Sequence, residues 1–365
     1  MEKDPVKKLK SLTFLVRDVR QIILSARSHI VKNINAVQVL ANFEIGRQII
    51  QYEQKGSKRA EYGKQVLKEL AERLSDEFGA GFSERNLRNM RKFYSVYQDR
   101  LGRIRQTPSA KSAGALRNQI APKRLESPFR LSWSQYVFLA GISDTAARSF
   151  YEIEAVNSNW TLPELTRQFN SGLYERLALS RDKEGVRKLA KEGQIVSKHE
   201  DLLKEPYVLE FLGIDEKEKY SESDLESAII DKIEKFLLEL GKGFLFEARQ
   251  KRFTFDEDHF FVDLVFYNRL LGCYVLIDLK IGKLTHQDLG QMQMYVNYFD
   301  RHVKTKEEYP TIGIILCQKK REALVQITLP KNANIHAKEY QLYLPSKEEL
   351  RQKLIEWSGG EKRRK

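Results

Sequence analysis

The sequence has little cysteine and no long apolar run. Its two cysteines, Cys273 and Cys317, lie in apolar strand-like segments and form neither a CxxC pair nor an even set of spaced cysteines. We therefore expect both thiols to be reduced and buried in a cytoplasmic protein. Arg17 and Asp18 interrupt the apolar run near the N-terminus, and no run approaches the ~18 residues that span a bilayer. We expect neither a secretory signal nor a membrane segment.

Two common site motifs are also missing. None of the six histidines forms an HxH or other metal-spaced pair, which argues against a histidine-ligated metal. No GxxxxGK[ST] motif occurs, so we expect no nucleotide cofactor and no ATP-driven translocation within this chain.

Positive charge is what the sequence has in excess. The 365 residues carry a net charge of +13, with 41% hydrophobic residues. The length predicts two or three domains with ordinary cores, and the charge favours an anionic partner, most commonly a nucleic acid. The alternative is a basic surface that serves only solubility.

The N-terminal part has helical periodicity from about residue 11 to residue 98. One amphipathic helix ends at Phe78, before the breaker residues Gly79-Ala80-Gly81. Ser83 is a candidate N-cap for a new helix that begins at Glu84.

This new helix has an apolar face and a basic face. The apolar residues are Leu87, Met90, Tyr94 and Tyr97, and the basic residues are Arg85, Arg88, Arg91 and Lys92. Two helices joined by a short glycine turn, the second rich in arginine, are compatible with a helix-turn-helix that docks into a nucleic-acid groove. A solvated cationic face on an ordinary bundle helix explains the same pattern.

Composition also predicts the domain boundaries. We expect a helical domain over residues 1–180, a charged hinge over 181–205, an α/β domain over 206–356 and a basic tail over 357–365. The first domain contains a basic linker or loop over residues 102–130. Its predicted core anchors are Trp133, Tyr136, Phe150, Tyr151 and Trp160.

The second domain alternates helices with apolar strands. The predicted order is a helix over residues 223–240, strand segments at 244–250 and 251–255, two strands within 260–280, a helix over 284–299, and strands at 311–317 and 340–345. Helices that cover a central mixed sheet are the expected architecture.

Two of these strands carry acids among apolar residues. On the first strand, alternation places Phe260, Val262, Leu264 and Phe266 on one face and Asp263 on the other. On the second strand, Asp278 and Lys280 share a face. Burying an unpaired carboxylate is costly, so these side chains require a partner or a metal ion.

The preceding helix adds a third acid. Its buried stripe runs through Ile229, Ile233 and Phe236, and ~100° per residue places Glu226 inside that stripe and Glu239 on the far side. Three convergent carboxylates and a lysine suit a phosphodiester hydrolase, because hard oxygen ligands bind Mg²⁺ (for which Mn²⁺ substitutes) and the cation neutralises charge on the transition state. The lysine would orient water or stabilise charge on the phosphate.

These residues resemble the PD-(D/E)XK nuclease motif, with Asp263 as the first acid and Asp278-Leu279-Lys280 as the second part. Asp278 replaces the more frequent Glu, and Val262 replaces the Pro. The resemblance implies a metal ion held by Asp263, Asp278, Glu226 and the Leu279 carbonyl.

QMQMY, residues 291–295, resembles the QxxxY element that some members of this superfamily carry. It implies that Gln291 faces the metal site and that Tyr295, with Lys283 nearby, contacts nucleic acid. Simple packing of Tyr295 is the alternative, because Met294, Tyr295 and Tyr298 have a spacing that suits a helix face.

Longer segments resemble the bacterial YhcG-like family. DLVFYNRLLGCYVLIDLK and GQMQMYV resemble its C-terminal nuclease domain, and FGAGFSERNLRNMRKFY and NSGLYERLALS its helical N-terminal domain. The resemblance implies a winged-helix-like DNA-binding or assembly module followed by a restriction-endonuclease-like domain. It further implies a general link to mobile elements and restriction-type defence.

Two functions from different classes follow. The first is a Mg²⁺-dependent DNA endonuclease that acts on foreign or branched DNA. The second is a nuclease fold that binds DNA or assembles with partners and no longer cuts. One active site cuts one strand, so a homodimer or higher oligomer is the usual route to a double-strand break.

Overall fold

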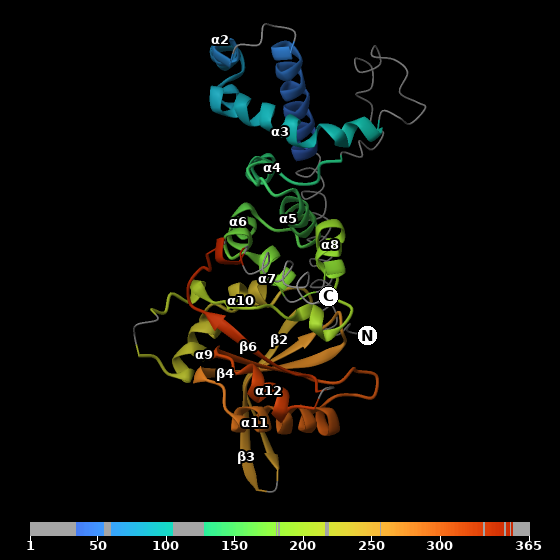
Figure 1. Cartoon of the computed structure of the whole chain (residues 1–365), viewed down its shortest axis with the longest axis vertical. Helices are drawn as coiled ribbons and strands as arrows, with labels where there is room; N and C mark the ends of the chain where they lie inside the picture. Colours follow the sequence, from blue (N-terminus) through green and yellow to red (C-terminus); the bar gives the residue numbers. More distant parts are fainter. Residues whose placement is uncertain are drawn as a thin grey trace, which may run out of the picture. The chain divides into compact units, whose positions relative to one another are not determined.

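The computed structural model describes residues 34–54, 60–104, 128–179, 181, 183–215, 219–255, 257–330, 333–346, 348–350 and 352 (Figure 1). The chain divides into two compact units, Met1–Arg148 and Ser149–Lys365. This division lies within the helical region expected over residues 1–180. The basic tail and most of the basic loop expected over 102–130 lie outside the described residues.

The first unit is built from helices. Residues 34–54 are helical, followed by α2 (Ala60–Phe78), the 3₁₀ turn η1 (Ala80–Phe82), α3 (Glu84–Ile104) and α4 (Trp133–Ala140). Gly79 separates α2 from η1 with φ +86°, a conformation that glycine adopts without strain. The expected break and the start of α3 at Glu84 are both confirmed.

An aromatic cluster forms the core of this unit. Phe93 of α3 is fully buried and contacts Phe43, Phe129 and Tyr136 at centroid distances of 5.9, 5.0 and 5.2 Å. Tyr94, expected on the buried face, is only half-buried. The helix is therefore rotated slightly from the predicted orientation.

The predicted aromatic anchors are confirmed with one exception. The buried ones are Tyr136, Phe150, Tyr151 and Trp160. Trp133 is half-buried, and its indole N–H donates to Asn86 Oδ1 at 2.9 Å. The described residues of the first unit contain no strand, so the wing of a winged helix does not occur in ranges 34–54, 60–104 or 128–148.

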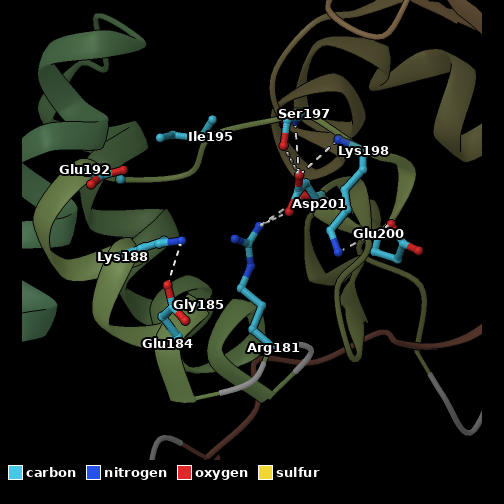
Figure 2. Close-up of a pocket in the computed structure, with 11 residues that line it drawn as sticks. Arg181, Glu184, Gly185, Lys188, Glu192, Ile195, Ser197, Lys198, Glu200 and Asp201 are labelled. Atoms are coloured by element: carbon cyan, nitrogen blue, oxygen red, sulfur yellow. Dashed lines mark hydrogen bonds and ion pairs between the residues drawn. The ribbon is translucent and has the colours of Figure 1, made fainter.

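Helix α5 (Thr145–Asn157) begins in the first unit and continues into the second. In the second unit it is followed by α6 (Leu162–Asn170), α7 (Leu173–Leu179), α8 (Lys183–Glu192) and the 3₁₀ turn η3 (His199–Leu202). The expected hinge over 181–205 thus contains regular structure. Asp201 Oδ2 accepts hydrogen bonds from the backbone N–H groups of Ser197 and Lys198, and its other oxygen pairs with Arg181 at 3.3 Å. These residues line a cavity of about 640 Å³ beside α8 (Figure 2).

A six-stranded mixed sheet forms the centre of this unit, in the order β1-β6-β5-β4-β3-β2. The strands are β1 (Tyr207–Val208), β2 (Phe244–Phe255), β3 (Asp258–Asn268), β4 (Cys273–Lys283), β5 (Ile312–Lys319) and β6 (Ile335–Gln341). Strands β2, β3 and β4 form an antiparallel meander, and β4, β5, β6 and β1 are parallel. The expected mixed sheet is confirmed.

Helices cover both faces of the sheet (Figure 1). On one face α9 (Glu222–Asp231) and α10 (Ile233–Leu240) pack with inward residues of β4 and β5; on the other lie α11 (His286–Tyr298) and α12 (Glu322–Thr328). The 3₁₀ turn η4 (Glu210–Leu212) precedes α9, and the π-helical turn η5 (Phe299–Val303) extends α11. A capping box between Thr285 and Asp288 begins α11.

Four local expectations are corrected by this unit. The last strand, expected over 340–345, is β6, which begins at Ile335 and ends at Gln341. The strand segments at 244–250 and 251–255 form the single strand β2, with a register irregularity between Phe246 and Ala248. Val262 packs in the α11-side cluster and Leu264 in the opposite one, so β3 loses its alternation at Asp263. Glu239, expected on the far side, is fully buried.

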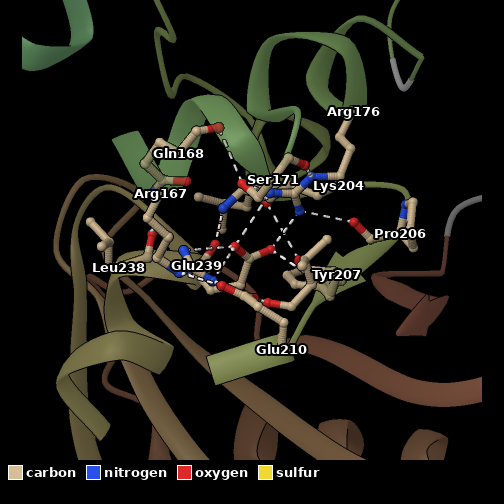
Figure 3. Close-up of polar contacts among 12 residues, drawn as sticks. Arg167, Gln168, Ser171, Arg176, Lys204, Pro206, Tyr207, Glu210, Leu238 and Glu239 are labelled. Carbon is tan, nitrogen blue, oxygen red and sulfur yellow. Dashed lines mark hydrogen bonds and ion pairs between the residues drawn. The ribbon is translucent and has the colours of Figure 1, made fainter. Parts of the chain in front are cut away.

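The break between α9 and α10 explains the burial of Glu239. Lys232 leaves helical geometry (φ −121°, ψ 33°), and its ammonium donates to the carbonyls of Phe211 and Leu212. The expected position of Glu239 assumes one uninterrupted helix over residues 223–240, and the break at Lys232 rotates every later residue relative to that helix. Glu239 then pairs with Arg176 at 2.5 Å, inside a network that also contains Arg167 and Lys204 (Figure 3).

Both cysteines are buried and make no disulfide, as expected. Burial raises the pKa of Cys273 to about 11 and that of Cys317 to about 12. None of the described helices has the length and apolar character needed to cross a membrane.

Candidate active site

Asp263 lies where two central strands stop pairing. The β3–β4 register ends at Leu264 and Ile277, and the Asp263 carboxylate takes the place of the next backbone partner. Its Oδ2 accepts the backbone N–H of Leu279 at 2.8 Å. The acid is thus fixed against β4, one residue beyond Asp278.

Asp278 and Lys280 lie beside this acid. Asp278 is 2% exposed, and its Oδ2 pairs with Lys280 Nζ at 3.0 Å but receives no hydrogen bond of regular geometry. Burial, and secondarily the negative charge of Asp263, raises the pKa of Asp278 to about 7. The site therefore contains a buried carboxylate oxygen whose bonding capacity is not filled.

Lys280 is held between two acids. Its Nζ lies 3.6 Å from Glu222 Oε2, and the other oxygen of Glu222 accepts the backbone N–H of Ile281 at 3.1 Å. Burial alone would lower the pKa of Lys280, but Asp278 and Glu222 outweigh it and raise that pKa above its usual range. The lysine is therefore a cation. Glu222, in the first turn of α9, was missed because exposed acids at helix N-termini are common.

Glu226 faces the site through other side chains. Arg249 and Gln250 of β2 contact its two oxygens, the Gln250 Nε2 at 2.5 Å, and the same Nε2 lies 3.0 Å from Asp263 Oδ1. Among the described residues, no three His, Cys, Asp or Glu side chains are spaced to hold one metal ion together. The structure thus brings Asp263, Asp278 and Lys280 together and connects Glu226 to them by way of Gln250.

The helix after β4 supplies the predicted Gln291 and Tyr295. Tyr295 is 1% exposed, packs edge-on against Phe253, and accepts a hydrogen bond from the Gln291 amide. Burial, and then the charge of Asp278, raises the pKa of Tyr295 to about 12. The packing interpretation of Tyr295 fits this burial, and the side chain presents no surface to a nucleic acid.

The remaining predicted DNA contacts lie at the surface. Lys283 is exposed at the end of β4. In the first unit, Arg85 and Lys92 are exposed, and Arg88 is exposed beside Glu84, with which it pairs. Arg91 is half-buried and pairs with Glu53 at 2.8 Å. Of the four basic residues predicted to contact nucleic acid, Arg85, Arg88 and Lys92 therefore form an exposed face of α3.

The donor set of the site fits a divalent cation. Two carboxylates lie close enough for Asp263 to raise the pKa of Asp278, and the buried Oδ2 of Asp278 is paired with Lys280 but has no hydrogen bond of regular geometry. Two like charges at short range are stabilised by a cation between them, and hard carboxylate oxygens are the ligands that Mg²⁺ and Mn²⁺ prefer.

Comparisons with known proteins match a family to each part of the chain. A family model described as the YhcG PDDEXK nuclease domain matches residues 200–355, and one described as the DUF1016 N-terminal domain matches residues 18–176. These two models meet near the segment that was expected to divide the chain.

Similar proteins include "Putative nuclease YhcG" of Escherichia coli (strain K12), which is 38% identical over 346 residues, 92% of this chain and 91% of that protein. A crystal structure of a repair endonuclease from Pyrococcus abyssi matches 36% of this chain and half of its own length, at 18% identity and a TM-score of 0.24. The match to the curated relative extends through both units. With its helical N-terminal region and its restriction-endonuclease-like C-terminal domain, the chain belongs to the YhcG family of PDDEXK nucleases.

Proposed function

We propose that this protein is a Mg²⁺-dependent DNA endonuclease. The observation that carries the proposal is the meeting of Asp263, Asp278 and Lys280 at one point of the sheet, with Lys280 Nζ 3.0 Å from an Asp278 oxygen that has no regular hydrogen bond. A buried carboxylate that lacks hydrogen bonds contributes little to the stability of the fold, but together with a cation it can bind a metal ion and a phosphodiester.

Asp263, Asp278 and the Leu279 carbonyl would hold the metal ion. When bound, Mg²⁺ would neutralise charge on the phosphate and lower the pKa of a coordinated water. Glu226 is not in this proposed ligand set, because Arg249 and Gln250 already contact both of its oxygens.

Lys280 acts as a cation in this proposal. Because its acidic neighbours raise its pKa, Lys280 keeps its proton at neutral pH and donates to a phosphate oxygen on which charge develops. Glu222 keeps the ammonium near Asp278. Gln291 is held by Tyr295 on the helix that borders the site, where its amide would orient water or a phosphate oxygen.

Cleavage of linear, branched and single-stranded DNA with Mg²⁺ or Mn²⁺ tests the proposal. Asp263→Asn, Asp278→Asn and Lys280→Ala should each reduce the rate by about 10²-fold or more, because each removes charge that stabilises the transition state. A preference for branched or foreign DNA over host linear DNA would support a role in defence or DNA processing.

Matched controls are Asp231→Asn and Lys235→Ala, which replace exposed residues at the end of α9 and on α10. Both should cut at the wild-type rate. Wild-type cleavage by Lys280→Ala or Asp263→Asn would reject the mechanism. DNA binding without cleavage on every substrate and metal would instead favour a nuclease fold that only binds or assembles.

The exposed face of α3 is the proposed DNA-binding surface. Arg85, Arg88 and Lys92 are exposed on one helix, and neutralised phosphates release counterions, so binding weakens as salt rises. Replacing all three with Ala should weaken binding on every sequence and reduce the slope of log K against log[salt] by about 2–3. An unchanged slope would assign this face to solvent or to a protein partner.

A further inference from the structure

Gln250 has an unusual backbone for a strand residue. It lies in the middle of β2 with φ +45°, in the left-handed region that non-glycine residues seldom occupy. Its neighbours Arg249 and Lys251 pair with Leu264 and Val262, which places Gln250 opposite Asp263. Such conformations persist where surrounding contacts over-determine them, and they cluster at functional sites.

The left-handed backbone gives two consecutive side chains access to one carboxylate. In a regular strand Arg249 and Gln250 would point to opposite faces of the sheet. Here Arg249 contacts Glu226 Oε1, and the Gln250 amide lies 2.5 Å from Glu226 Oε2. The conformation of Gln250 is therefore coupled to the position of Glu226.

The Gln250 amide connects Glu226 to the proposed metal site. Its Nε2 carries two hydrogens, and it lies within bonding distance of Glu226 Oε2 and, at 3.0 Å, of Asp263 Oδ1. The other Asp263 oxygen accepts the Leu279 N–H at 2.8 Å. Two donors from two strands thus fix the orientation of Asp263.

A neutral donor is suited to this place. An amide satisfies a lone pair of Asp263 without adding positive charge, so the carboxylate remains available to a cation. An arginine at the same point would compete with the metal ion for Asp263. The positively charged neighbour, Arg249, is bound by Glu226 and Ser227.

From these contacts we infer that Gln250 is a positioning residue that holds Asp263 in the orientation needed for metal binding, and that Glu226 acts through Gln250. This inference rests on the proposed function and extends it, because it assigns Glu226 to the support of the site.

The test compares Gln250→Gly with Lys251→Gly in the full-length protein. Glycine at position 250 removes the amide and relieves the left-handed backbone. Glycine at exposed position 251 adds backbone freedom to the same strand and removes a surface ion pair with Glu247, away from Asp263 and Glu226. Three measurements are made: the unfolding midpoint, the Kd for Mn²⁺ by calorimetry without DNA, and the exchange rate of the Leu279 amide proton without metal.

Gln250→Gly should have an unfolding midpoint no lower than that of Lys251→Gly. Its Kd for Mn²⁺ should rise about 10-fold, the usual cost of removing a group that orients a ligand, and its Leu279 amide should exchange faster. Lys251→Gly should keep the wild-type Kd and Leu279 exchange. Wild-type values of both quantities in Gln250→Gly would overturn the inference.

Glu226→Ala distinguishes support from direct ligation. This substitution is made alone and together with Gln250→Gly. If Glu226 acts through Gln250, the double variant Glu226→Ala/Gln250→Gly should bind Mn²⁺ no more weakly than Gln250→Gly alone. Additive losses would make Glu226 a ligand in its own right and overturn its assignment here.

The Leu279 measurement separates this inference from the proposed function. Wild-type protein that binds Mn²⁺ but cuts no DNA would reject the endonuclease, and the change in Kd would still decide the role of Gln250. If the wild-type protein binds no metal, unchanged Leu279 exchange in Gln250→Gly rejects the positioning role, and faster exchange supports it.

Discussion

The second unit buries two carboxylates that have opposite electrostatic character. Glu239 is fully buried and Asp278 is 2% exposed. Burial by itself would raise the pKa of Glu239, but Arg176, Lys204 and Arg167 lower it to about 2. Burial together with Asp263 raises the pKa of Asp278 to about 7. Similar burial therefore has opposite results, because three cations surround Glu239, whereas Asp278 has a single cation, Lys280, and a second carboxylate beside it.

The bonding of the two acids differs in the same way. Glu239 Oε1 pairs with Arg176 at 2.5 Å and accepts the Val208 N–H at 3.0 Å, and Arg167 lies 3.4 Å from Oε2 (Figure 3). Asp278 Oδ2 has only the ion pair with Lys280. The carboxylate of Glu239, whose oxygens have several partners, joins α7, β1 and α10. The carboxylate of Asp278, which has fewer partners, is available to a ligand.

The largest expected effect is on the saturated pair. Arg176→Met should lower the free energy of unfolding by about 3–5 kcal/mol, because it leaves Glu239 buried without its main partner. Urea denaturation at pH 7 measures this loss. A loss below ~1 kcal/mol would mean that Arg167 and Lys204 suffice and that the cluster is less tightly coupled than its distances suggest.

The double variant Arg176→Met/Glu239→Gln is the control for this pair. Because the pKa of Glu239 is lowered from 4.5 to about 2, its ionisation stabilises the native state fully above pH 4.5, and this contribution is lost as the pH falls toward 2. The double variant has no ionisable group at position 239, so this part of the acid loss should disappear. If the wild-type protein and the double variant lost the same stability between pH 4.5 and pH 2, the pairing of Glu239 would be contradicted.

A smaller effect of opposite sign is expected at the unsaturated acid. Asp278→Asn, measured without metal at pH 8, should raise the free energy of unfolding by about 1 kcal/mol or more, since it removes a buried negative charge beside Asp263. The same variant should have lost cleavage. A destabilised Asp278→Asn protein would place Asp278 with Glu239, as a structural charge, and would remove the contrast between the two acids.

Local signals in the sequence were sufficient to predict the helices and strands that carry the proposed DNA-binding face and part of the candidate active site. The glycine break and Ser83 predicted the start of α3. Threonine and aspartate, three positions apart at Thr285 and Asp288, are residue types that form a capping box, and they do so at the start of α11. Alternation predicted β3 and β4 with acids among apolar residues. These signals depend on neighbours within a few positions, which the chain itself specifies.

The sequence did not show which helix face is buried, nor which residues far apart in the chain pair with each other; both were seen only in the folded structure. A break at Lys232 decided that Glu239 is buried, and Arg176, its partner, lies 63 positions earlier in the sequence. Tyr94 and Phe93 differ by one helical position, so a small rotation of α3 decided which of them is buried.

The sequence by itself determined a helical N-terminal region followed by a mixed sheet with flanking helices, and it singled out Asp263, Asp278 and Lys280. Only the tertiary structure revealed that Gln250 and Glu222 adjoin these residues, and that Glu226 reaches Asp263 through an amide. The reason is physical. A left-handed residue and a strand pair that separates at Leu264 are consequences of packing between segments, and no periodicity within one segment encodes them.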